Sequence, residues 1–271
     1  MKVHHVSCGT MCPVGFELLD VHPKPHAMIC HVLVVETNDG LVLVDTGFGT
    51  HDVANRSQLG GPFNLFVRPT LDPRETALAR VESLGFHARD VRHIVPTHLD
   101  LDHAGGLPDF PDAKVHVYSK ELDAVTRRAT FHERMRYRPA HFAHEPKFAS
   151  YEVEGERWNG FECVRQLEGL PPEILLVPTV GHTRGHVAVV VESEGGALCH
   201  AGDAYFHRDE MRPTEPRCPL PLRLFQSSVA IDDLARVRNR ERLRLLARDH
   251  AEVRIFCAHD PVEAEALGVV R

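Results

Sequence analysis

Apolar residues gather along the chain in short β-branched runs, which are typical of buried strands. The first two runs, HVLVVET at residues 31–37 and LVLVDTG at residues 41–47, flank the tripeptide NDG. This arrangement predicts a β-hairpin, because the turn is rich in residues that accept positive φ. Further runs of the same kind predict six more strands, at residues 91–97, 114–119, 174–179, 187–193, 197–203 and 253–260.

Helical patterns lie between these strands. The stretch DPRETALARVESLGF, residues 72–86, predicts a helix with Asp72 as N-cap, Pro73 in the first turn, Glu75 completing a capping box and Gly85 ending it. Further helices are expected from about Lys120 and over residues 232–249. Residues 131–150 mix aromatics, histidines and arginines without clean periodicity, so we interpret them as a loop excursion.

The order of these elements indicates the fold class. Strands outnumber helices and alternate with them in blocks, which favours two sheets packed face to face with helices on the outer faces. No low-complexity linker or short repeat interrupts the 271 residues. We therefore predict an α/β protein with a single domain over residues 1–271.

The composition of the chain excludes several classes of function. The formal net charge is −7, and the one basic stretch, residues 236–248, has the leucine spacing of a helix with a solvated basic face, so a nucleic-acid binder is not expected. No apolar run approaches the roughly 20 residues of a membrane helix, and residues 1–15 lack the apolar core of a signal peptide. Seven irregularly spaced cysteines form no disulfide framework, which favours the cytoplasm. A small-molecule substrate is expected, and a homodimer is left open.

Twenty histidines are the unusual feature of the composition, and several follow strand ends. Four predicted strands run into metal-binding side chains, in IVPTHLDLDH, LLVPTVGHTRGH, ALCHAGD and RIFCAHD. Strand ends that meet at one edge of a sheet can hold such side chains together. One histidine of this kind is most simply structural, but four segments in the same position favour a metal site.

These segments resemble the metallo-β-lactamase superfamily, whose pattern H-x-H-x-D-H is followed by G-H-T-x-G-H, an aspartate and a final histidine. The resemblance extends over nearly the whole chain and implies the four-layer αββα sandwich of that family. It implies two metal ions, with zinc favoured and manganese or iron as alternatives. The metal ligands implied are His98, Asp100, Asp102, His103, His182, Asp203 and His259.

In that assignment one metal is held by His98, Asp100 and His182, and the other by Asp102, His103 and His259. Asp203 bridges the two. The resemblance further places Asp45 behind the ligands as a supporting acid and makes His186 a structural residue. Two adjacent cations would supply a bridging hydroxide and polarise the bond under attack, with Asp102 as the catalytic acid–base residue.

Asp100 departs from the family pattern, which has histidine there. An aspartate oxygen reaches about as far from the backbone as histidine Nδ1, so we expect Asp100 to bind the metal and to favour harder ions. The alternative is a weak or empty first site. Tyr205 lies near the position where lactone-hydrolysing relatives have a catalytic tyrosine, one residue out of register, and we name it as a second catalytic candidate; a packing role is the alternative. His207, Arg208 and residues 131–150 are candidates for a lid, although we favour the alternative that they form a solvated loop.

The resemblance favours a metallohydrolase that cleaves a small ester-like bond, with lactonase activity first. A thioesterase of the glyoxalase II kind and a phosphodiesterase are the nearest alternatives. His98, His182 and Asp203 alone would match the two-histidine, one-carboxylate triad of iron oxygenases, so an iron dioxygenase acting on a sulfur substrate is a further alternative. A non-catalytic metal-binding protein is the last.

Overall fold

Two β-sheets form the centre of the computed structural model, which describes residues 1–19, 27–164, 166–193 and 195–270. The larger sheet has the strand order β1-β2-β3-β4-β5-β6, antiparallel up to β3 and parallel from β3 onward. Its strands are β1 (Lys2–Met11), β2 (Met28–Thr37), β3 (Gly40–Val44), β4 (Val91–Val95), β5 (Lys114–Tyr118) and β6 (Lys147–Tyr151). The smaller sheet has the order β12-β11-β10-β9, with strands β9 (Ile174–Pro178), β10 (Val187–Ser193), β11 (Gly196–His200) and β12 (Val253–Phe256).

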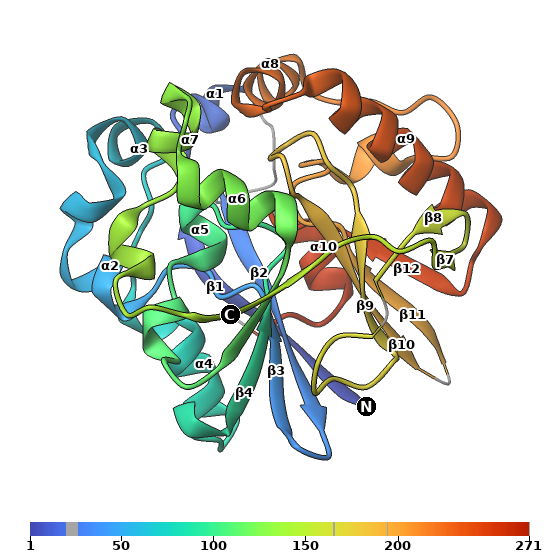
Figure 1. The fold of residues 1–271 in the computed structure, drawn as a ribbon. Coiled ribbons are helices and arrows are strands. Elements are labelled where there is room, and N and C mark those ends of the chain that lie inside the picture. The colour runs from blue at the N-terminus through green and yellow to red at the C-terminus, as the bar shows by residue number, and fades with distance from the viewer. Residues whose placement is uncertain (20–26, 165, 194, 271) are drawn as a thin grey trace.

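The helices lie mainly on the outer faces of these sheets, as Figure 1 shows. They are α1 (Phe16–Leu19), α2 (Thr50–Ala54), α3 (Gly61–Phe66), α4 (Ala77–Ser83), α5 (Leu101–Ala104), α6 (Ser119–Arg127), α7 (Phe131–Arg136), α8 (Leu220–Val229), α9 (Asp233–Asp249) and α10 (Pro261–Ala266). A small hairpin of β7 (Arg157–Trp158) and β8 (Phe161–Glu162) lies beside α9. Among the described residues, no helix has the length and apolar character needed to cross a bilayer.

Alternation along the strands produces the layers. On β2, Leu33 and Val35 pack with residues of the smaller sheet, whereas Val32 and Val34 pack with residues of α4 and α6. On β10, Val189 joins the contact between the sheets and Val190 packs toward α9. Because successive side chains of a strand point to opposite faces, each sheet is apolar on both faces and needs a cover on each. The predicted αββα sandwich is confirmed.

Most predicted elements are present, including the hairpin β2–β3 and the helix α9 with Asp232 as its N-cap. The predicted capping box at residues 72–86 is wrong. Asp72 caps only a 3-10 turn, Glu75 accepts a hydrogen bond from the Thr10 hydroxyl instead, and α4 begins at Ala77. Thr76 caps α4, since its hydroxyl accepts the Ala79 N–H.

The interpretation of residues 131–150 as a loop excursion is also wrong. This segment contains α7, a 3-10 turn at Pro139–Phe142 and the edge strand β6. A complete capping box begins α7, with the Thr130 hydroxyl accepting the Glu133 N–H and the Glu133 carboxylate accepting the Thr130 N–H. The aromatic and charged residues hid the short helix, because six residues are too few to show a helical period.

Candidate metal centre

The candidate site forms where strands of both sheets end at the same edge of the sandwich. The segment after β4 brings His98 and Asp100, and α5 carries Asp102 and His103. Three further segments follow β9, β11 and β12 and contribute His182, Asp203 and His259 respectively. All seven side chains that the sequence predicted as ligands therefore meet in one cluster, and all except Asp102 are almost fully buried.

Asp203 lies at the centre of this cluster with its two oxygens facing opposite groups. Its Oδ2 is 3.3 Å from His182 Nε2 and 3.8 Å from His98 Nε2. Its Oδ1 is 3.0 Å from His259 Nε2 and 3.3 Å from His103 Nε2. A carboxylate in this position can bridge two cations, one on each side.

The two groups around Asp203 are completed by the other aspartates. Asp100 Oδ2 lies 3.1 Å from His182 Nε2 and 3.5 Å from His98 Nε2. Asp102 Oδ2 lies 3.7 Å from His259 Nε2. One ligand atom each of His98, Asp100 and His182 lies within 4.8 Å of the others, a spacing that one metal ion can span.

The ring nitrogens that face away from the cluster are held by other groups. His103 Nδ1 is 2.8 Å from Asp45 Oδ2, and His259 Nδ1 is 2.7 Å from the Ile29 carbonyl oxygen. Such partners fix which nitrogen of an imidazole is free to bind a metal. His186 does not face the cluster with a free nitrogen, since its Nε2 accepts the backbone N–H of Asp203 at 2.9 Å. It therefore positions Asp203.

The electrostatics of the cluster couple these groups strongly. Burial alone would raise the pKa of Asp203, but His259, His103 and His182 hold it well below its usual range. Burial likewise opposes protonation of His103, yet the carboxylates of Asp203 and Asp45 raise its pKa well above the usual value. Burial lowers the pKa of His182 to about 4. The Asp203 carboxylate therefore remains anionic, and its negative charge attracts cations to the site.

The donor set fits divalent metal ions. Three buried atoms of these side chains, His98 Nε2, Asp100 Oδ1 and Asp203 Oδ1, have no hydrogen-bond partner among the described residues. Buried polar atoms are nearly always satisfied, and leaving one unpaired costs about 1–3 kcal/mol. Imidazole nitrogens and carboxylate oxygens are the donors that zinc, manganese and iron accept. Bound cations would satisfy these atoms together.

Arg136 is a residue of this site that the sequence did not reveal. It comes from α7, its Nη1 lies 3.2 Å from Asp100 Oδ2, and both side chains are about nine-tenths buried. The same nitrogen donates to the carbonyl of His182, and Nη2 donates to the carbonyl of Val229. Burial would raise the pKa of Asp100, but Arg136, followed by His98, holds it well below its usual value. Arg136 thus offsets the negative charge that Asp100 adds at a position where the family pattern has a histidine.

Glu121 is a second residue that sequence reasoning missed. It lies on α6, is 1% exposed and accepts hydrogen bonds from the backbone N–H of Leu99 at 2.9 Å and of Gly185 at 3.0 Å. The hydroxyl of Thr183 donates to it at 2.7 Å. Glu121 therefore joins the loop of His98 to the loop of His182. No sequence pattern marks it, because a glutamate near a helix start is most simply a solvent-exposed residue.

A cavity opens onto the cluster, and its walls are mainly apolar. Asp100, Asp102, His182, Asp203 and His259 lie at its polar end. The walls are formed by side chains of the N-terminal segment, β2, α3 and the residue after it, α5, the loop after β11 and α8: Met11, Pro13, Phe16, Met28, Phe63, Val67, Leu101, Phe206, Phe225 and Val229. The N-terminal segment CGTMCP, residues 8–13, thus contributes Met11 and Pro13 to the wall.

The placement of Tyr205 as a catalytic residue needs correction. Tyr205 is fully buried, packs in the core between the smaller sheet and α9, and is not among the residues that line the cavity. Its hydroxyl donates to the carboxylate of Glu263 at 3.0 Å. The next residue, Phe206, lines the cavity instead and stacks on the ring of His259. The backbone directs the side chain of Phe206 into the cavity, and the side chain of the preceding Tyr205 therefore points into the core.

The candidate lid residues His207 and Arg208 do not line the cavity either. The guanidinium of Arg208 lies 3.2 Å from Asp260, on the α10 side of the loop. His93 and His116 share a hydrogen bond of 2.9 Å between Nδ1 and Nε2 and lie outside the cluster. From the excursion, only Arg136 reaches the cavity.

Comparisons with known proteins agree with this geometry. The family description "Metallo-beta-lactamase superfamily" matches residues 27–259. A protein of Mycobacterium tuberculosis named "Probable metallo-hydrolase" is 40% identical over 262 residues, which cover 96% of this chain and 81% of that protein. An N-acyl homoserine lactonase of a Bacillus species is 25% identical and covers 86% of this chain and 82% of its own.

A solved N-acyl homoserine lactone hydrolase, with the product N-hexanoyl-L-homoserine at its catalytic metal centre, has the same fold. The TM-score is 0.72 at 20% identity, and the match covers 98% of this chain and 95% of the other. A dizinc quorum-quenching lactonase matches with a TM-score of 0.59 at 19% identity, covering 96% and 90%. The matched span includes every segment of the cluster, and the chain belongs to the metallo-beta-lactamase superfamily.

Proposed function

We propose that this protein is a metal-dependent hydrolase that opens the ester bond of a lactone with an apolar substituent. The observation that carries the proposal is the apolar cavity that ends on the aspartate and histidine cluster. Sites for small molecules combine apolar walls with a few polar groups that fix orientation. Relatives and solved structures that are named as N-acyl homoserine lactonases or lactone hydrolases support the same substrate class.

Two divalent cations, with zinc favoured, are proposed for the cluster. His98, Asp100 and His182 would hold one, Asp102, His103 and His259 the other, and Asp203 would lie between them. When bound, such a pair supplies a nucleophilic hydroxide and polarises the carbonyl of the substrate. Asp102 lies at the end of the cavity and is the most exposed carboxylate of the cluster, so it is placed to orient the nucleophile and to carry a proton to the leaving oxygen.

The charge of the cavity favours a lactone over a phosphodiester. Arg136 is the only lysine or arginine among its lining residues in the described part of the chain. Its guanidinium is paired with Asp100 at 3.2 Å and is not available to a substrate phosphate. A neutral ester with an acyl chain matches the remaining walls, because each buried methylene contributes about 0.8 kcal/mol to binding.

The location that we propose is a reducing compartment, the cytoplasm. All seven cysteines are free in the structure, and five of them are buried. Structural disulfides are characteristic of oxidising compartments, so a chain with seven free thiols fits a reducing one.

The test is a substrate comparison on protein that has been stripped with a chelator and then reloaded with zinc or manganese. We expect hydrolysis of N-acyl homoserine lactones to return with the metal and kcat/KM to rise with acyl length. A glutathione thioester and a phosphodiester should be poor substrates, and Asp102→Ala should lose the lactonase activity. Unchanged hydrolysis by Asp102→Ala, a preference for either other substrate, or oxygen consumption with one iron per chain would overturn the proposal.

A further inference from the structure

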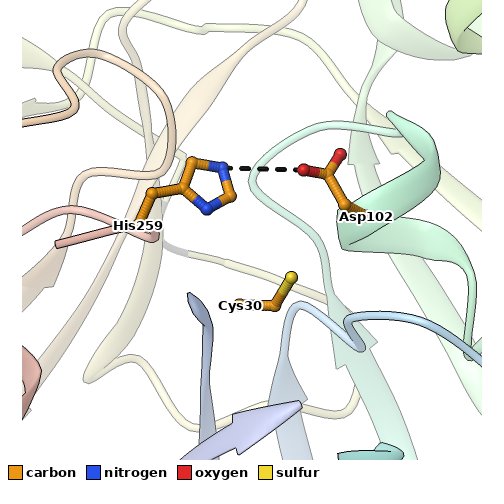
Figure 2. A group of neighbouring side chains, drawn as sticks. All are labelled: Cys30, Asp102 and His259. Carbon is orange, nitrogen blue, oxygen red and sulfur yellow. Dashed lines mark ion pairs between the residues drawn. The ribbon is translucent and has the colours of Figure 1, made fainter. Parts of the chain in front are cut away.

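A third side chain lies beside Asp102 and His259 in a position that the metal pattern of the sequence does not include. One ligand atom each of Cys30, Asp102 and His259 lies within 4.8 Å of the other two. Figure 2 shows the three side chains pointing toward one another from three separate segments. Cys30 is 2% exposed and belongs to β2, far in the sequence from every residue of the cluster.

The backbone holds Cys30 in this place. The N–H groups of Ile29 and His31, its two neighbours, donate to the carbonyls of His259 at 3.4 Å and Ala258 at 2.9 Å. The carbonyl of Ile29 also accepts from His259 Nδ1 at 2.7 Å, so the residue before Cys30 aims the other ring nitrogen into the cluster. The thiol and the imidazole are therefore positioned by the same contact between β2 and the loop after β12.

The neighbours of the thiol leave it facing the cluster. Met28, two positions earlier on the same face of β2, lines the cavity, so Cys30 lies one step deeper on the side that ends at the cluster. A Cβ built on Gly9 would lie 3.1 Å from Cys30 Sγ, so the glycine leaves space for the sulfur. Among the described residues, the Cys30 thiol donates no hydrogen bond. An acceptor in the same cluster, Asp203 Oδ1, is buried and has no hydrogen-bond partner either.

From this geometry we infer that Cys30 is a thiolate ligand of the metal held by Asp102 and His259. The inference rests on the proposed two-metal centre and goes beyond it, because it makes the two sites chemically different. Asp102 Oδ2 and His259 Nε2 are 3.7 Å apart, close to the roughly 3.4 Å that a tetrahedral zinc sets between its oxygen and nitrogen ligands. The sulfur would add one metal–sulfur bond, and its proton would pass to solvent as the cation binds.

The consequence is one hard site and one softer site. Each site would have one carboxylate of its own, Asp100 in the first and Asp102 in the second, and both would share Asp203. Cys30 would add a sulfur to the second site alone. Thiolates select zinc, whereas carboxylates suit manganese and other hard ions. The protein should therefore hold unlike metals in its two sites when both are offered.

The test uses the whole protein loaded with cobalt(II), which gives a sulfur-to-cobalt charge-transfer band in the near ultraviolet when a thiolate binds it. We expect this band in the wild type and its loss in Cys30→Ser. The matched control is Cys199→Ser, because Cys199 is equally buried but lies in the smaller sheet and should leave the band unchanged. With equal zinc and manganese, the wild type should bind about one of each, and Cys30→Ser should lose this selectivity together with roughly 10-fold or more of its zinc affinity.

Two bound cobalt ions without the band would overturn the inference, as would a band that survives in Cys30→Ser. Absence of the band in the wild type decides against a thiolate ligand however well the variant folds, and the spectrum of Cys30→Ser decides whether a band that is present belongs to Cys30. These outcomes are separable from the proposed function. Lactone hydrolysis by a two-metal protein without the band leaves the hydrolase standing and removes only the thiolate, whereas a band in a protein that hydrolyses no lactone does the reverse.

Discussion

Replacing Arg136 by methionine tests how Asp100 is held at the candidate centre. Methionine keeps the length and apolar stem of arginine but removes the guanidinium that lies 3.2 Å from Asp100 Oδ2. In protein without metal, Asp100 would become a buried carboxylate that has lost the one arginine with which it pairs in the described part of the chain. With metal bound, the cation would take over that role.

The structure sets the size of the effect. A pair of unit charges 3.2 Å apart interacts by about 5 kcal/mol at an effective dielectric constant of 20. This agrees with the roughly 3–5 kcal/mol lost when one partner of a buried ion pair is removed. Arg136 also donates to the carbonyls of His182 and Val229, and each lost hydrogen bond costs about 1 kcal/mol.

We take about 3 kcal/mol for the ion pair, the lower end of the range measured for buried pairs, and about 1 kcal/mol for each hydrogen bond. Arg136→Met should then lower the free energy of unfolding by about 5 kcal/mol in chelator and by about 2 kcal/mol with metal, because the two hydrogen bonds are lost in both conditions. By linkage, the difference of about 3 kcal/mol equals a gain of roughly 100-fold in metal affinity. The assay is urea unfolding of wild type and variant, each with chelator and with saturating zinc.

The matched control is Arg236→Met. Arg236 is as deeply buried and pairs with Asp233 at 2.6 Å, but neither residue lines the cavity or the cluster. Its loss of stability should be the same with and without metal. Arg136→Met could instead lose the same free energy of unfolding in both conditions, or bind zinc more weakly than the wild type. Either result would show that a bound cation does not replace Arg136 as the partner of Asp100.

Three further predictions address the core and the cavity. Tyr205→Phe should keep kcat/KM for lactones and lose about 1 kcal/mol of stability, since Glu263 is the one residue of the described chain to which its hydroxyl donates a hydrogen bond; a 100-fold fall in kcat/KM would contradict this placement. Burial raises the pKa of Glu263 from 4.5 to about 7, so its contribution to stability is present below pH 4.5 and is lost as the pH rises to 7. Urea unfolding in chelator should show this loss, about 3 kcal/mol, in the wild type and not in Glu263→Gln; equal pH profiles would refute it. Phe63→Ala should raise KM for long-chain lactones by about 10-fold and hardly change that for short ones, whereas an equal rise for both would place the acyl chain elsewhere.

Much of the fold could be predicted from sequence because the signals are local. The β-branched runs of β2, β3 and β10 are bounded by turns. Because successive side chains of a strand point to opposite faces, an unbroken apolar run predicts a sheet that is covered on both faces. The start of α4 was misplaced because Asp72 and Thr76 are both good N-caps, and only the tertiary contact of Glu75 with Thr10 decides between them. Competing local signals of this kind cannot be ranked without the surrounding structure.

The metal ligands were predictable because they follow strand ends in a recognisable order, although their roles in binding stay a proposal. The side chains around them were not. Arg136, Glu121 and Cys30 reach the site from α7, α6 and β2, and their sequence neighbours carry no pattern that points to a metal. Tyr205 shows the converse, since one residue of register separates a buried core tyrosine from the cavity wall.

We infer above all that Asp100 takes part in a two-metal centre. The decisive experiment is elemental analysis of protein purified without added metal, beside the same measurement on Asp100→His. We expect about two metal ions per chain in both proteins, with a larger share of zinc in Asp100→His, because imidazole suits zinc better than carboxylate does. One ion per chain in the wild type, rising to two in Asp100→His, would show that Asp100 pairs with Arg136 and does not bind a metal.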